Sequence, residues 1–344
     1  MNSSGFSIAM CTYNGARFLS EQLESIAAQS LLPDEIVICD DMSADATTEI
    51  VRDFASRTPI PVRLFTNEQN LGSTRNFARA IGLCQGQLIA LSDQDDVWLP
   101  QKLERLAAMF DRQPGAGMVF SDAEVVDEKL CARGPTLWSQ IGFDATVRQR
   151  FLRGQTFEVL LPGWTVTGAT AAFRSTYRDL ILPIPTDLSM IHDGWIALVI
   201  AAVAEVALIE EPLIKYRQHA AQQIGAPERA ARSTPLRIKS LDGLQAAMRH
   251  ENSYDALITI GEQVKERLQS RCADFDCGDA LSRLDQRLAH LRTRSRMPGT
   301  SFSRLAPVFR ELFAGRYHRY STGFRSAAKD LFRDPSRSLA DRQR

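Results

Sequence analysis

Short apolar runs alternate with amphipathic helical patterns through the first part of the chain, and this alternation constrains the fold more than any other feature. The apolar runs cover residues 7–11, 35–39, 62–65, 88–91 and 118–120, and each is typical of a buried strand. Between them, residues 17–29, 44–56, 73–84 and 100–112 place apolar side chains at helical spacing. This order predicts an α/β fold with a mostly parallel sheet and helices on both faces.

Polar side chains follow three of these strands. In parallel sheets, ligands bind beyond the carboxyl ends of the strands. A solvated turn or a helix cap explains any one cluster, because Asp, Asn and Ser are favoured there. Three clusters on one edge of one sheet point instead to a ligand site. They are Thr12, Tyr13 and Asn14 after the first strand, Asp40 and Asp41 after the second, and Asp93, Asp95 and Asp96 after the fourth.

The third cluster crowds three carboxylates into four residues. Like charges at this spacing resist ionisation unless a cation or hydrogen-bond donors lie among them. Mg²⁺ or Mn²⁺ fits, because such a cation takes one or two protein carboxylates together with substrate phosphates. The chain has neither a GxxxxGK[ST] loop nor a GxGxxG after its first strand. A metal-bridged diphosphate is therefore predicted, with its nucleoside held by the other two clusters. Asp96 has an alternative role, as a cap of the helix that follows.

The motifs resemble a known enzyme family. The stretches are SIAMCTYNGARF, EIVICDDMSADA, NLGSTRNFARAI and GQLIALSDQDDVWLPQKL, and they occur in the order found in the nucleotide-sugar domain of family 2 glycosyltransferases. The resemblance runs from about residue 6 to about residue 220. It implies the GT-A fold, which is Rossmann-like. The motifs SDQDD and HDGW are similar to those of bacterial rhamnosyltransferase-like enzymes of surface polysaccharide assembly.

The resemblance implies a donor-binding role for the first two clusters. Thr12, Tyr13 and Asp41 would contact the base and ribose of the donor, with Asn14 in the same group. Asp41 would accept from a pyrimidine N–H, and Asp40 is the nearby alternative.

The resemblance also implies roles further along the chain. Asn70, Gly72 and Arg75 would lie in the loop and helix start that close over the nucleotide. Asp93 and Asp95 would form the DxD motif at the metal, with Asp95 as the direct ligand and Asp93 nearer the ribose.

A catalytic base is expected at Asp193. Transfer to an acceptor hydroxyl requires a group that removes its proton, and relatives place an aspartate here, often in an ED pair. This chain has His192 before Asp193, and we interpret that histidine as a local hydrogen-bond partner. Asp193 could instead cap the following helix. Trp164 and Gly168 lie in a segment similar to the one before the acceptor pocket. Gly168 would allow close backbone approach, and Trp164 would stack on a sugar or belong to the core.

The stretch YRQHAAQQIG resembles a loop that folds over the diphosphate. In it, His219 is a candidate metal or phosphate contact and Arg217 a candidate phosphate contact. Relatives often have Asn where this chain has Gln222 or Gln223, so the loop departs from the family pattern.

The chain changes character after the first domain. We expect residues 1–225 to form the nucleotide-sugar-binding and catalytic domain and residues 234–344 a helical, basic region. Residues 287–344 carry 14 Lys and Arg against 4 Asp and Glu, although the whole chain has a net charge of zero. A basic amphipathic segment can lie on an anionic membrane surface or pack as a solvated helix, and both alternatives stay open. No nucleic-acid recognition motif accompanies the charge.

Composition sets the compartment. None of the six cysteines forms a CxxC pair, and the first ten residues lack the features of a signal peptide, so we expect a cytoplasmic protein, peripheral at the inner face of the plasma membrane if the basic segment attaches. The apolar run 194–204 is too short to cross a bilayer and predicts a buried helix.

These features together predict an inverting, metal-dependent glycosyltransferase, with Mg²⁺ or Mn²⁺ as cofactor. The donor would be a UDP- or dTDP-sugar, with rhamnose suggested by the resemblance, and the acceptor a saccharide or a lipid-linked saccharide of surface polysaccharide synthesis. Two alternatives are a sugar-1-phosphate nucleotidyltransferase and a binding module that has lost transfer. The first would be expected to carry a Gly-rich basic loop, which CTYNGARF matches poorly.

Overall fold

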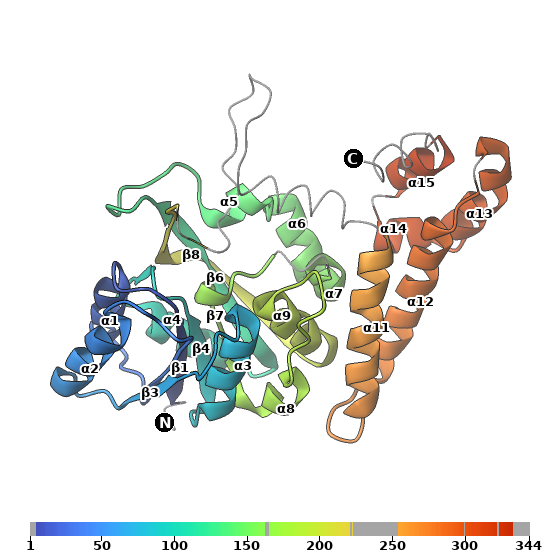
Figure 1. Ribbon diagram of the computed structural model, residues 1–344. Helices are drawn as coiled ribbons and strands as arrows, with labels where there is room; N and C mark the ends of the chain where they lie inside the picture. The colour runs from blue at the N-terminus through green and yellow to red at the C-terminus, as the bar shows by residue number, and fades with distance from the viewer. Residues whose placement is uncertain are drawn as a thin grey trace. The chain divides into compact units, whose positions relative to one another are not determined.

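The computed structural model describes residues 5–161, 165–220, 222, 254–298, 300–321 and 323–332 (Figure 1). The chain divides into two compact units, residues 1–241 and 242–344. Trp164 and Gln223, both singled out in the sequence, lie outside the described residues.

An eight-stranded sheet forms the centre of the first unit, in the order β3-β2-β1-β4-β7-β6-β8-β5. The strands β1 to β4 pair in parallel, β6 and β8 pair in parallel, and β7 and β5 run antiparallel to their neighbours. The predicted α/β fold is therefore confirmed, with three antiparallel pairings added to its parallel part. The strands are β1 (Phe6–Thr12), β2 (Glu35–Asp40), β3 (Val62–Thr66), β4 (Leu88–Ser92), β5 (Val97–Trp98), β6 (Ala116–Val126), β7 (Ala171–Arg174) and β8 (Glu205–Arg217).

Helices cover both faces of this sheet (Figure 1). The apolar stripes of α1, α2 and α4 share one buried cluster with side chains of β1 and β2, whereas α3 and α9 pack together. Helix α9 is buried along residues 192–202, which confirms the predicted buried helix. The helices are α1 (Leu19–Ala27), α2 (Thr47–Arg57), α3 (Ser73–Leu83), α4 (Lys102–Arg112), α5 (Leu137–Ile141), α6 (Ala145–Arg150), α7 (Thr156–Leu160), α8 (Arg178–Ile181) and α9 (His192–Val203).

The second unit is helical, as predicted. Helices α11 and α12 lie side by side, and Figure 1 shows α13, α14 and α15 gathered at one end of that pair. The helices are α11 (Tyr254–Ser270), α12 (Gly278–Ser295), α13 (Ser301–Phe313), α14 (Arg316–Tyr320) and α15 (Phe324–Leu331). In the part of the chain that the structure describes, every helix is too short or too polar to span a bilayer.

Close packing between β6 and α9 depends on a residue without a side chain. A Cβ atom on Gly117 would lie 2.8 Å from the Cβ of Ala204, from the Cγ2 of Ile200 and from a ring carbon of Tyr177. Real Cβ atoms do not approach other carbons this closely, so any side chain here would push the helix from the sheet.

We therefore expect Gly117→Ala to lower the free energy of unfolding by about 1–3 kcal/mol, the usual cost of overpacking. Urea denaturation followed by circular dichroism measures it. Gly115→Ala is the matched control, because its Cβ would meet only the flexible end of Glu205 at 3.4 Å. Equal stabilities of the two variants would contradict this account of the packing.

Candidate active site

The sheet order brings the three polar clusters together. Strand β1 lies between β2 and β4, and all three run in the same direction. Thr12 pairs in register with Asp40, and Met10 pairs with Ser92, so the residues after each strand emerge at one edge. The predicted convergence of the clusters on that edge is present in the structure.

Asp40, in the second cluster, forms hydrogen bonds with other residues of the protein. The hydroxyl of Thr12 donates to Asp40 Oδ1 at 2.8 Å, and the backbone and hydroxyl of Ser43 donate to the same carboxylate at 2.9 and 2.6 Å. Asp40 is fully buried. Its visible function is to hold the turns after β1 and β2 against each other.

Asp41 fixes the loop before α3. Its carboxylate accepts from the backbone N–H groups of Leu71 and Gly72 at 2.7 and 2.8 Å, and from the amide of Asn67 at 2.7 Å. Gly72 has φ +76°, a conformation that favours glycine. A contact between Asp41 and the base of a nucleotide stays a prediction. The predicted contacts of Asn70 and Arg75 with the sugar donor also stay predictions. Asn70 lies 3.4 Å from the Asp41 carbonyl, and Arg75 is exposed at the start of α3.

The turns at this edge are held in an uncommon conformation. Asn14 and Met42 both have left-handed backbone angles, with φ +48° and +64°. Ser43 accepts from the backbone of Asn14, and Gln94 forms two hydrogen bonds with the backbone of Tyr13, at 2.8 and 3.1 Å. The Tyr13 residue is 43% exposed, so its ring is available at the rim. Such outliers concentrate at binding sites.

Asp93 and Asp193 share one electrostatic environment although they are far apart in the sequence. Burial, followed by the charges of Asp95 and Asp193, raises the pKa of Asp93 to about 7. Gly168 lies between the two segments, because a Cβ atom on it would be 3.4 Å from the Asp193 Cβ and 3.5 Å from Leu91 at the end of β4.

Asp95 contacts His219, and both residues are candidate metal ligands in the sequence. The Nε2 atom of His219 lies 2.8 Å from Asp95 Oδ2, and its ring packs 4.8 Å from the ring of Phe18. The His219 Nδ1 atom has no hydrogen-bond partner among the described residues. Two ligand atoms at adjacent positions on one metal ion, each about 2.1 Å from the ion, are separated by a distance comparable to the 2.8 Å between His219 Nε2 and Asp95 Oδ2.

The donor set fits a hard divalent cation that needs substrate oxygens to complete its shell. Asp95 offers a carboxylate oxygen and His219 an imidazole nitrogen at the same point, and Asp93 is close enough for its pKa to be raised by the charge of Asp95. Within the described ranges, no three acidic, His or Cys side chains are grouped closely enough to hold a metal unaided.

Asp96 does not cap a helix, so that alternative is wrong. Its Oδ1 atom accepts from the backbone N–H of Arg217 at 3.0 Å, whereas α4 begins only at Lys102. The carboxyl is fully buried, and burial together with the neighbouring charges raises its pKa well above the usual value. Asp96 therefore ties the end of β8 to the acidic cluster.

Arg217 joins three segments of the chain through hydrogen bonds of its side chain. Its guanidinium donates to the carbonyl oxygens of Asp95 and Glu128 at 2.7 and 2.6 Å and to the carboxylate of Glu21 at 2.5 Å. The side chain is fully buried. A phosphate contact for Arg217 stays a prediction. Gln222 closes the same turn through hydrogen bonds with Arg217 and His219.

Lys102 is a site residue that the sequence analysis missed. It is fully buried, its Nζ donates to the carbonyl of Ala169 at 2.6 Å, and it lies 3.5 Å from the ring centroid of Trp98. Burial lowers the pKa of Lys102, and the charges of Asp96 and Asp93 oppose that change. A lysine on the apolar stripe of a helix was the available signal.

Asp193 lies in the first turn of α9, and the N-cap is Ile191. Its Oδ2 and Oδ1 atoms accept from the backbone N–H groups of Gly168 and Gly194 at 3.0 and 2.7 Å. Burial raises the pKa of Asp193 to about 6. The structure thus shows a positioned, buried carboxylate, and its role as the base stays a prediction.

His192 packs beside this carboxylate. Its ring stacks on Phe77 at 4.0 Å, and burial lowers the pKa of the histidine to about 3, so the ring is neutral. A Cβ atom on Gly168 would lie 3.4 Å from the Asp193 Cβ and from His192 Nε2, so this backbone packs directly against both residues.

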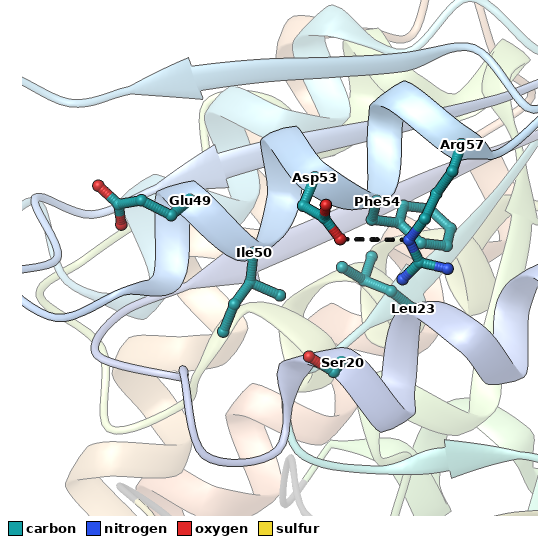
Figure 2. A pocket seen from close by; sticks show the side chains of 7 residues that line it. All are labelled: Ser20, Leu23, Glu49, Ile50, Asp53, Phe54 and Arg57. Carbon is teal, nitrogen blue, oxygen red and sulfur yellow. Dashed lines mark hydrogen bonds and ion pairs between the residues drawn. The ribbon is translucent and has the colours of Figure 1, made fainter.

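A separate pocket lies between α1 and α2 (Figure 2). Arg57 and Asp53 pair across one turn at 3.2 Å in its wall. The pocket contains no residue of the acidic cluster and does not extend the site. It is lined by Ser20, Leu23, Glu49, Ile50, Asp53, Phe54 and Arg57.

Comparisons with known proteins show the family to which the chain belongs. A family model described as glycosyl transferase family 2 matches residues 7–180. An uncharacterized protein of Mycobacterium bovis is 29% identical over 223 residues, which cover 62% of this chain and 59% of that protein. The chain therefore spans less than two thirds of that relative.

Two further proteins resemble the chain. The dTDP-rhamnosyl transferase RfbG of Shigella flexneri is 26% identical over 223 residues, 63% of this chain and 74% of that one. The crystal structure of S. aureus TarS 1-349 in complex with UDP-GlcNAc matches with a TM-score of 0.55 and 17% identity, over 95% of this chain and 88% of that one. That structural likeness supports the fold.

Because the pKa of Asp193 is raised, we expect this carboxyl to lower the free energy of unfolding as the pH increases. A carboxyl that binds its proton more tightly in the folded state stabilises the fold below its unfolded pKa, and this contribution is lost as the pH rises through about 6. We expect the stability of Asp193→Asn relative to wild type to increase from pH 4 to pH 7 by roughly 1–3 kcal/mol.

Chemical denaturation of both proteins across this range measures the difference. The substitution also removes an acceptor for one N–H group, but that offset does not vary with pH. A difference that stays constant from pH 4 to pH 7 would show that the Asp193 pKa is not raised.

Proposed function

The chain belongs to glycosyl transferase family 2, and on that premise we propose that it is an inverting, metal-dependent enzyme that moves a sugar from a nucleoside diphosphate to an acceptor hydroxyl. The observation that carries the proposal is that Gly168 lies between Asp93 and Asp193. Its N–H donates to Asp193 at 3.0 Å, and a Cβ atom on it would lie 3.5 Å from Leu91, two residues before Asp93. Sugar transfer needs a cation site for the leaving diphosphate and a base for the acceptor, and Asp93 and Asp193 supply one each.

The donor we propose is a UDP- or dTDP-sugar. One relative is named a dTDP-rhamnosyl transferase, and TarS was crystallised with UDP-GlcNAc. Rhamnose is the sugar we propose first, in the synthesis of a cell-surface polysaccharide. Thr12, Tyr13, Asn14 and Asp41 would bind the nucleoside at the edge where their loops meet.

Asp93, Asp95 and His219 would hold Mg²⁺ or Mn²⁺. When bound, such an ion stabilises the negative charge that develops on the leaving diphosphate. The 2.8 Å contact between Asp95 and His219 supports this assignment, because it brings an oxygen and a nitrogen ligand to one point. Asp96 accepts from the backbone N–H of Arg217, so its carboxylate is engaged with the protein, and Asp93 and Asp95 are the carboxylates of the cluster that we assign to the cation.

Asp193 would remove the proton of the acceptor hydroxyl. Two backbone N–H groups orient its carboxylate, and a pKa of about 6 leaves it ionised yet basic at neutral pH. Attack in one step, opposite the leaving diphosphate, inverts the anomeric carbon. Gly168 leaves room for close approach of the acceptor.

The family membership sets aside the alternative of a sugar-1-phosphate nucleotidyltransferase. The alternative of a binding module without transfer activity remains a distinct outcome of the experiments below. We also propose a saccharide or lipid-linked acceptor, with the basic helical unit in contact with the membrane that would carry it.

The proposal is tested by measuring the release of nucleoside diphosphate. The protein is incubated with Mg²⁺ or Mn²⁺ and a panel of UDP-, dTDP- and GDP-sugars. We expect metal-dependent turnover of one donor and a loss of about 10²- to 10³-fold in Asp95→Ala, because the leaving-group charge is no longer stabilised. Asp53→Ala, which removes an exposed carboxylate of α2, is the control and should leave the rate unchanged. Binding of a donor without turnover of any would favour the silent module.

The pH profile tests the base. We expect kcat/KM for transfer to rise roughly tenfold per pH unit below pH 6 and to level off above it, because only ionised Asp193 accepts a proton. Asp193→Asn should abolish transfer while binding of the donor persists in a calorimetric titration. Transfer at the wild-type rate by this variant would rule out the assignment.

A further inference from the structure

Helix α13 is turned with its aromatic side chains toward the solvent. Phe302 and Phe313 are 85% and 86% exposed, and Phe309 is 47% exposed. Residues seven and eleven positions apart lie on one face of a helix, so the three rings share one side. The opposite side buries Val308 together with Arg304 and Glu311, so two charged side chains are buried on this helix while three aromatic rings are exposed.

Helix α15 repeats the arrangement. Phe324 and the adjoining Phe332 are 69% and 75% exposed, whereas Asp330 is buried. The carboxylate of Asp330 accepts from Arg294 at 2.6 Å and from the hydroxyl of Tyr317 at 2.8 Å. Internal partners therefore neutralise the acid and keep it from the surface.

The exposed charge of this region has one sign. Residues 300–332 contain two acids, Glu311 and Asp330, and both are buried. Glu311 is held by His290 and Arg316, each at 2.8 Å. Four basic side chains of α13, α14 and α15 are exposed, and these are Arg310, Arg319, Arg325 and Lys329.

We propose that the outer surface of α13 and α15 binds an anionic lipid bilayer. Phenylalanine rings enter the boundary between headgroups and acyl chains, and the basic side chains pair with lipid phosphates, which are the two contributions that attach interfacial helices. This proposal adds a lipid surface to the proposed function. It rests on the proposed function only to explain why the enzyme would be at a membrane.

A second copy of the chain fits this surface less well. Self-association through it would bring the exposed basic side chains of two copies together with no acid on either side to oppose them. A bilayer with acidic phospholipid supplies both the missing negative charge and an apolar phase for the rings.

Sedimentation of the full chain with vesicles tests the inference. We expect binding to vesicles that mix phosphatidylcholine with phosphatidylglycerol and little binding to phosphatidylcholine alone. Phe302→Ser combined with Phe313→Ser should weaken binding roughly a hundredfold, about tenfold for each ring. Arg325→Gln combined with Lys329→Gln should weaken it roughly fivefold per charge and reduce its dependence on salt.

Leu32→Ser is the matched control, because Leu32 is 47% exposed on the first unit and should not affect vesicle binding. All these residues lie outside the proposed catalytic site, so titration with nucleoside diphosphate should be the same in each variant. Failure to bind vesicles with nucleotide binding intact would overturn the membrane surface and leave the proposed enzyme standing.

Two other results would also overturn the inference. Equal loss of binding to a soluble polyanion and to vesicles in the phenylalanine variant would show that the rings do not enter lipid. A wild-type oligomer that dissociates in the same variant, measured by light scattering, would show that a second copy covers the surface.

Discussion

The crowding of three carboxylates at the end of β4 is the constraint around which the first unit is organised. Each carboxylate receives a different environment. Asp96 turns inward to the backbone of Arg217, Asp95 meets His219, and Asp93 stays near Asp193. Arg217 then joins three distant segments, because its guanidinium reaches Glu21, the carbonyl of Asp95 and that of Glu128. Arg217 thus stabilises the chain around the acidic cluster, and buried Lys102 interacts with the charges of Asp96 and Asp93.

Much of this site could be predicted, because its motifs occupy strand ends. The strands β1, β2 and β4 are buried on both faces, so their runs are mostly apolar, and their order along the chain fixes the edge at which Asp41 and Asp93 emerge. Strand β8 escaped prediction since it mixes buried and exposed positions and carries Glu210 and Glu211. Strand β7 is four residues long, and β5 only two, too short for a periodic pattern.

The internal hydrogen bonds of the site lay beyond the sequence. Nothing in the spacing of Asp40 and Asp41 distinguishes a carboxylate that faces a nucleotide from one that holds a loop, and the structure shows both engaged with the protein. The burial of Lys102 depends equally on where Ala169 and Trp98 come to lie. Such contacts join segments far apart in the chain, and local periodicity carries no information about them.

The raised pKa values of Asp93 and Asp193 are linked, because the charge of Asp193 is among the causes that raise the pKa of Asp93. A Coulomb interaction belongs to the pair, so ionising either residue opposes ionising the other. Any positive charge held at Asp93 and Asp95 relieves that opposition and favours the ionised form of Asp193. Binding of a divalent cation at Asp93 and Asp95 would therefore lower the pKa of Asp193, so that more of this carboxyl is ionised when the cation is present.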